Sequence, residues 1–161
     1  MKSLLTRGVF LLLLASSGLS QHRPKFSDYP TRSSFKGKSA HVRLVGDNLA
    51  RLYRTQLRNA AAAGPNFAGR YAMGTWGCGS PCLMAGMVDL MSGKVIWPPI
   101  PAMMVFDISF HMNSRLLIIN SREVLEKNWP TGPPKWIEGE WPEELFFVWN
   151  GKRFVIRSAR Q

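Results

Sequence analysis

The chain has 161 residues and a formal net charge of +11. Its length suits one domain with a real core, and no apolar run reaches the roughly 20 residues that a transmembrane helix needs. The charge is uneven, because residues 21–70 hold ten Lys or Arg against two Asp, whereas residues 136–144 hold four Glu and no Lys or Arg. This composition disfavours a membrane-spanning domain and indicates a basic domain with one acidic segment.

The first twenty residues are typical of a secretory signal peptide. Lys2 and Arg7 form a positive region, residues 8–15 form a short apolar core, and small residues that suit a signal peptidase follow. We expect cleavage after Ser17 or Ser20, and a mature chain in the periplasm or outside the cell. The alternative is a membrane anchor, which the short apolar core disfavours.

Residues 21–39 are polar, basic and interrupted by Pro24 and Pro30, so we expect a flexible lead-in there. The remaining residues, 40–161, are expected to form a single β-rich domain. Within it, His41–Val45 has the pattern of a short edge strand.

A helix is predicted from Asn48 to Ala63. Asp47 is a suitable N-cap residue, and Gly64-Pro65 is a stop signal. Apolar residues at helical spacing predict one buried face, formed by Leu49, Leu52, Tyr53, Leu57 and Ala60. The opposite face carries three arginines, Arg51, Arg54 and Arg58. These arginines could bind phosphate or carboxylate groups, or they could simply form a solvated face.

After this helix the pattern changes to strands and turns. Three hairpins are predicted, pairing Arg70–Trp76 with Leu83–Leu90, Met103–Phe110 with Arg115–Asn120, and Glu144–Trp149 with Lys152–Arg157. The turn Asn150-Gly151 in the third is a strong hairpin signal, because both residues tolerate positive φ. A short strand is also expected at Lys94–Trp97. We therefore predict an α+β, mostly β fold: a twisted antiparallel meander sheet, as a sandwich or partial barrel, with one N-terminal amphipathic helix packed on it.

The two cysteines, Cys78 and Cys82, lie close together in Trp-Gly-Cys-Gly-Ser-Pro-Cys. In an exported chain such a pair is most simply a disulfide that clamps one turn. A redox motif would normally have two residues between the cysteines, and here there are three. A zinc site would need two more ligands, and His41 and His111 are remote in the sequence. We therefore expect a disulfide, and neither a metal nor a cofactor.

The run from Gly64 to Gly69, Gly-Pro-Asn-Phe-Ala-Gly, followed by Trp76-Gly77-Cys78-Gly79 and Cys82, resembles a group of small exported proteins of Gram-negative bacteria. Those proteins carry a G-P-N-F-A-G…W-G-C-G-x-x-C signature. The resemblance extends from Tyr53-Arg54 to Trp149-Asn150-Gly151 and covers most of the mature chain. It implies an exported location more than an activity. Many relatives are expected to have a histidine where this chain has Arg70. In structural terms, Phe67 is expected to anchor the corner between helix and strand in the core.

A short helix is predicted over Arg122–Asn128, and a proline-rich connection follows it. This connection carries three tryptophans, Trp129, Trp136 and Trp141. They could cover one end of the core, or they could form an aromatic groove that stacks a sugar ring or a peptide, with Trp136 or Trp141 exposed beside it. The same region holds four glutamates that could supply two carboxylates for glycoside chemistry, Glu138, Glu140, Glu143 and Glu144.

The leading functional hypothesis is a periplasmic, non-enzymatic binding or inhibitor-like module for an anionic or envelope partner. A basic exported protein meets anionic lipid or polymer more often than nucleic acid, and we expect no nucleic-acid partner. The candidate binding residues are Arg51, Arg54, Arg58, Trp136 and Trp141. One alternative is a hydrolase that acts on cell-envelope polymer through residues 136–144. Another is a purely structural envelope protein.

Overall fold

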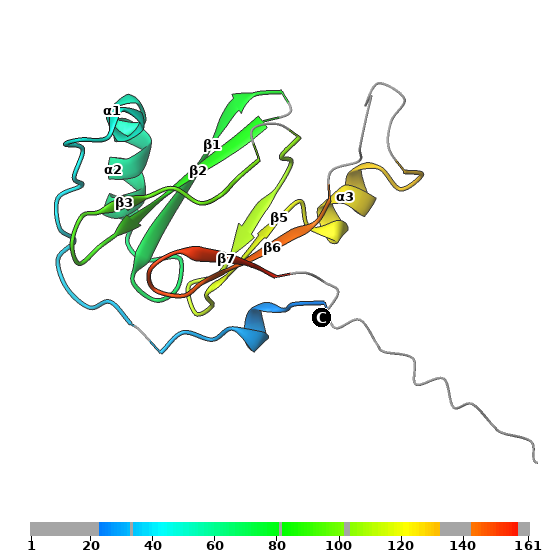
Figure 1. Cartoon of the computed structure of the whole chain (residues 1–161), viewed down its shortest axis with the longest axis horizontal. Helices are drawn as coiled ribbons and strands as arrows, with labels where there is room; N and C mark the ends of the chain where they lie inside the picture. The colour runs from blue at the N-terminus through cyan, green and yellow to red at the C-terminus, as the bar shows by residue number, and fades with distance from the viewer. Residues whose placement is uncertain (1–22, 33, 81, 102–103, 133–142, 158–161) are drawn as a thin grey trace, which may run out of the picture.

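The computed structural model describes residues 23–32, 34–80, 82–101, 104–132 and 143–157, and it confirms an α+β, mostly β fold (Figure 1). Two antiparallel sheets make up most of it, and each follows the chain as a meander. None of the helices in these ranges has both the length and the apolar character that crossing a bilayer requires.

The first sheet has the order β1-β2-β3 and contains β1 (Tyr71–Gly79), β2 (Cys82–Asp89) and β3 (Val95–Ile96). The second has the order β4-β5-β6-β7 and contains β4 (Ile108–Phe110), β5 (Leu116–Ile119), β6 (Leu145–Trp149) and β7 (Phe154–Arg157). The three predicted hairpins therefore all form. The last one closes through four residues, because the side chain of Asn150 accepts hydrogen bonds from the backbone N–H groups of Lys152 and Arg153, both at 2.9 Å.

The main core lies between the two sheets. The first sheet contributes buried residues such as Met73 and Met87, and the second contributes Leu117, Ile119 and Phe147. Side chains that alternate along each strand reach this core from both sheets, as expected for packed sheets with one shared interior. The predicted sandwich is therefore the arrangement that forms.

Phe67 is fully buried in this core, as predicted, and its ring stacks on Phe154 with centroids 6.0 Å apart. The Gly-Pro-Asn-Phe-Ala-Gly run therefore fastens the end of the helical region to the last hairpin.

The predicted helix forms as two pieces, α1 (Asn48–Leu52) and α2 (Arg54–Ala63), which lie against the outer face of the first sheet (Figure 1). Asp47 is the N-cap, and its side chain accepts from the N–H of Ala50 at 2.9 Å. The break falls at Tyr53, whose ring lies 4.8 Å from Trp76 and 6.4 Å from Trp97, centroid to centroid.

The break changes which face of the helical segment is buried. Leu57 is fully buried, as predicted, but Leu52 is 67% exposed and Leu49 is 38% exposed. The prediction that Leu49 and Leu52 belong to the buried face is therefore wrong. Ala50 and Ala61 lie in the interface together with Leu57.

The N-terminal segment differs from the predicted flexible lead-in. Its short 3₁₀ helix η1 (Phe26–Asp28) packs with Tyr29 on the outer face of the second sheet, a face formed by buried residues of β5 and β6. The hydroxyl of Ser114 donates to the carbonyl of Phe26 at 2.8 Å. An apolar sheet face must be covered, and this segment covers it.

Residues 35–43 continue along the molecule as a bonded but irregular strap. The N–H of Arg43 donates to the carbonyl of Gly93 at 2.8 Å, and the N–H of Ala40 donates to that of Leu90 at 2.9 Å. The predicted strand His41–Val45 does not form, because these single bonds make no continuous ladder.

The predicted helix α3 (Arg122–Asn128) does form.

Cys78 and Cys82 form the predicted disulfide, with Cα atoms 5.2 Å apart. It joins the adjoining ends of β1 and β2, where the pairing of the strands shifts between Gly77 and Gly79. The bond therefore clamps one hairpin turn, a local role that suits its short loop.

Candidate anion-binding site

The predicted arginines of the helical segment are exposed, but they do not converge on one site. Arg51 contacts the side chain of Asn48, and Arg54 donates to the carbonyl of Arg51 at 3.2 Å. Arg58 lies farther along α2, where it lines a shallow groove with Lys38 and His41. Whether these residues bind an anion stays a prediction.

The predicted aromatic groove cannot be placed, because Trp136 and Trp141 lie outside the described residues, as do Glu138 and Glu140. Of the remaining acidic residues in that region, Glu144 has structural partners. It accepts from Nε of Arg23 at 2.8 Å and from the N–H of Arg122, the first residue of α3, at 2.8 Å.

A different group of residues forms a polar cavity of about 380 Å³ where the loop between β6 and β7 lies beside the start of β1 (Figure 1). We call it the arginine pocket, and it is lined by Thr31, Ala68, Arg70, Tyr71, Arg115, Trp149, Asn150 and Gly151. These residues come from the N-terminal segment, the Gly-Pro-Asn-Phe-Ala-Gly run, the start of β1 with the preceding Arg70, the residue before β5, and the last hairpin. Sequence reasoning singled out neither Arg115 nor Thr31 for this site.

The floor of the arginine pocket is a loop with a constrained backbone. Ala68 has φ of 45°, a left-handed conformation that is uncommon outside glycine. Its N–H donates to the carbonyl of Ser114 at 3.1 Å, and the N–H of Gly69 donates to that of Met112 at 2.6 Å. Such conformations persist only where the surroundings enforce them, and they concentrate at functional sites.

Arg70 enters the pocket with only part of its charge neutralised. Its Nη2 lies 2.9 Å from Oδ2 of the buried Asp89, and its guanidinium lies 5.0 Å from the centroid of the Tyr71 ring. Its Nε is buried and has no hydrogen-bond acceptor among the residues that the structure describes. The ion pair orients the guanidinium and leaves one strong donor unused.

The other donors of the pocket are also short of acceptors. Arg115 donates from Nε to the carbonyl of Pro30 at 3.2 Å and forms no ion pair with any residue in the described ranges. Trp149 is 3% exposed, and its indole Nε1 has no acceptor within the described ranges. Because most buried polar groups are paired, two such donors on residues that line one pocket are unusual.

This arrangement can hold an anion. Arginine presents a planar fork that matches a carboxylate or a phosphate, and an indole N–H adds a neutral donor. The described residues that line the pocket include no His, Cys, Asp or Glu, and its charged side chains are those of Arg70 and Arg115. The geometry therefore suits recognition of a negatively charged group.

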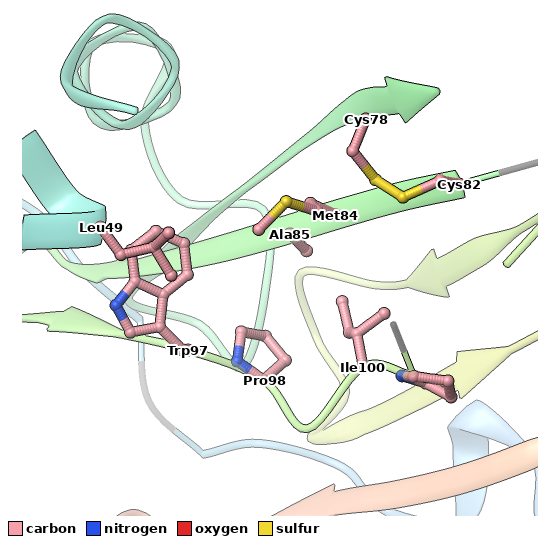
Figure 2. Close-up of a pocket in the computed structure, with 9 residues that line it drawn as sticks. Leu49, Cys78, Cys82, Met84, Ala85, Trp97, Pro98 and Ile100 are labelled. Atoms are coloured by element: carbon pink, nitrogen blue, oxygen red, sulfur yellow. A yellow bond between two sulfur atoms is a disulfide. The ribbon is translucent and has the colours of Figure 1, made fainter. Parts of the chain in front are cut away.

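A second cavity, of about 420 Å³, lies beside the disulfide (Figure 2). Its walls are almost wholly apolar and include Leu49, Met84, Trp97, Ile100 and the Cys78–Cys82 bond. Trp97 is held in place because its indole Nε1 donates to Oδ2 of Asp47 at 2.8 Å. This hydrogen bond is the largest cause that lowers the pKa of the Asp47 carboxyl below its ordinary value, and the hydrogen bond from the N–H of Ala50 is the second.

Comparison of the chain with known protein families, with curated proteins and with solved structures finds no match. The resemblance based on the signature residues therefore stays a prediction. The structure does bring Ala68 of that signature close to Trp149, Asn150 and Gly151, to which the resemblance extends, since all four line the arginine pocket.

Proposed function

We propose that this protein is an exported, non-enzymatic binding module that recognises an anionic group of an envelope partner through the arginine pocket. The disulfide and the absence of a membrane-spanning helix in the described ranges fit an extracytoplasmic protein. The signal-like N-terminus supports export to the periplasm.

The observation that carries this proposal is the surplus of donors in one pocket. Arg70, Arg115 and Trp149 supply guanidinium and indole N–H groups, and two of these, Nε of Arg70 and Nε1 of Trp149, are buried with no acceptor in the part of the chain that the structure describes. An unmade hydrogen bond of a buried group costs about 1–3 kcal/mol. A carboxylate or phosphate oxygen that reached these donors would remove that cost and would gain charge-assisted bonds.

Part of the Arg70 side chain is accessible, since it is 32% exposed. A ligand anion that entered the pocket would meet Arg70 and Arg115 first.

The test is a titration of the protein with inorganic phosphate and with acetate, followed through the ¹⁵N–¹H signal of the Trp149 indole. The Trp149→Phe protein identifies that signal. We expect saturable movement of the signal with at least one anion. Arg115→Gln should weaken binding about tenfold or more, because a hydrogen bond to a charged group contributes about 1.5–3 kcal/mol.

Arg54→Gln is the matched control, because it removes the same charge from an exposed arginine outside the pocket. It should leave the dissociation constant unchanged. The assignment of the pocket would be refuted if the indole signal did not move with either anion. It would also be refuted if Arg115→Gln and Arg54→Gln lost affinity equally. The hydrolase alternative predicts instead that the protein releases reducing ends from purified cell-envelope polymer.

A further inference from the structure

Three exposed apolar side chains gather at one edge of the molecule, within and just before α1. Val45 is 96% exposed, Leu52 is 67% exposed and Leu49 is partly exposed. They lie within eight residues, whereas the other exposed large apolar residues, Met91, Met112 and Ile156, are scattered along the chain. Single exposed apolar residues need no explanation, but a group of them marks an interaction site.

Arginines surround this group. Arg43 precedes it in the sequence, Arg51 lies between Leu49 and Leu52, and Arg54 follows Leu52, all three exposed. The one acidic residue of the segment, Asp47, directs its carboxylate to the indole of Trp97 and the N–H of Ala50. The outward side is therefore apolar in part and otherwise cationic.

The fold holds this edge rigidly. Ala50 is fully buried, Asp47 caps α1, and the ring of Tyr53 packs against Trp76, so α1 cannot turn its leucines inward. In Figure 1, α1 lies at the edge of the molecule away from β6 and β7. The exposed side chains are thus a fixed feature of the surface.

We propose that Val45, Leu49 and Leu52, with Arg43, Arg51 and Arg54, form a docking surface for an anionic lipid bilayer. The apolar side chains enter the interfacial region, and the guanidinium groups contact lipid phosphates. Apolar side chains with flanking cations are the combination that binds such interfaces. This site is separate from the arginine pocket, so the inference does not depend on the function proposed above.

The chemistry of the surface favours lipid over the other occupants. A polyanionic polymer would engage the arginines but would offer no apolar phase to Val45 and Leu52. A stable protein partner or a second copy of the chain would need about 800 Å² from each side, with an apolar centre larger than the three apolar side chains of this surface provide.

The test is co-sedimentation with vesicles of phosphatidylcholine alone and of phosphatidylcholine mixed with phosphatidylglycerol. Every variant is made in the full chain and purified in the same way, so all share the same N-terminus, and binding to phosphatidylcholine alone is the background. Val45→Ser with Leu52→Ser should lower binding to the anionic vesicles about tenfold. Arg51→Gln with Arg54→Gln should lower it about fivefold for each charge.

Ile156→Ser is the matched control, because Ile156 is 61% exposed but lies on β7, away from this surface. It should bind like the unmodified protein, and so should Arg115→Gln, which alters only the arginine pocket. The proposal is overturned if the control loses as much binding as the apolar double variant. It is also overturned if only the arginine variants lose binding, since that result describes adsorption to any polyanion.

Sedimentation velocity without lipid tests whether a second copy of the chain occupies this surface instead. We expect a monomer for the unmodified protein. A dimer that Val45→Ser with Leu52→Ser dissociates would make this surface a contact between copies and would overturn the lipid assignment.

Discussion

Leu57 and Leu52 provide a matched pair for testing how α1 and α2 pack. Both are leucines of the same helical segment, but Leu57 is fully buried against the first sheet and Leu52 is mostly exposed. Replacing a buried Leu by Ala costs about 2–5 kcal/mol, because transfer energy is lost and a cavity is left. Leu52→Ala should cost less than about 1 kcal/mol, since only about a third of that side chain leaves water on folding.

Leu57 packs directly over Gly86 of β2, so the two positions should be energetically coupled. A Cβ added at Gly86 would lie 2.7 Å from Cδ2 of Leu57 and 3.0 Å from ring atoms of Trp76 and Trp97. Gly86→Ala should therefore cost about 1–3 kcal/mol by overpacking. Truncating Leu57 removes the tightest of these contacts, so the double variant should be less destabilised than the sum of the single variants, by about 0.5–3 kcal/mol.

The assay is urea unfolding followed by far-UV circular dichroism, with the free energy of unfolding compared at equal m-values. Equal losses for Leu57→Ala and Leu52→Ala would show that the segment packs as one continuous helix with both leucines inward. Additive losses for Leu57→Ala and Gly86→Ala would show that the two residues do not touch. Either result would refute the packing described here.

Three further predictions follow from local contacts. Thiol labelling of the unreduced, denatured protein should find no free cysteine, and replacing the Cys78–Cys82 pair by serines should cost about 2 kcal/mol in urea unfolding. Gly93→Ala should destabilise the fold, because φ is +73° there and a Cβ would collide with the carbonyl of His41; unchanged unfolding would contradict that placement. Because the hydrogen bond from Trp97 lowers the pKa of the Asp47 carboxyl below its ordinary value, the stabilising effect of this hydrogen bond should be present above the ordinary pKa and lost as the pH falls through the lowered one. Asp47→Asn should therefore flatten the acid limb of the stability curve.

Local signals were sufficient where neighbouring residues act on one another. Asp47 before a helical pattern, Asn150-Gly151 between two strands, and two cysteines four residues apart each indicated a feature that the structure confirms. These features depend on capping, turn conformation and short loop closure, and all three operate over a few residues.

Periodicity failed where packing decided the outcome. The helical spacing of Leu49 and Leu52 predicted a buried face, but Tyr53 joins Trp76 and Trp97 and breaks the helix there. The chain direction changes at that point, so residues before the break no longer share a face with those after it. Likewise, the polar lead-in is packed because Phe26 and Tyr29 are needed to cover the second sheet.

The sequence by itself determined the α+β, mostly β class, the hairpins and the disulfide, because hydrophobic alternation and turn chemistry act locally. Only the tertiary structure decided the arginine pocket, whose members Thr31, Arg70, Arg115 and Trp149 are far apart along the chain. Their meeting depends on how the last hairpin packs beside β1 and on how the N-terminal segment covers the second sheet. Such contacts carry no signal in any short window of sequence, since they arise only when separate elements bury their apolar faces against one another.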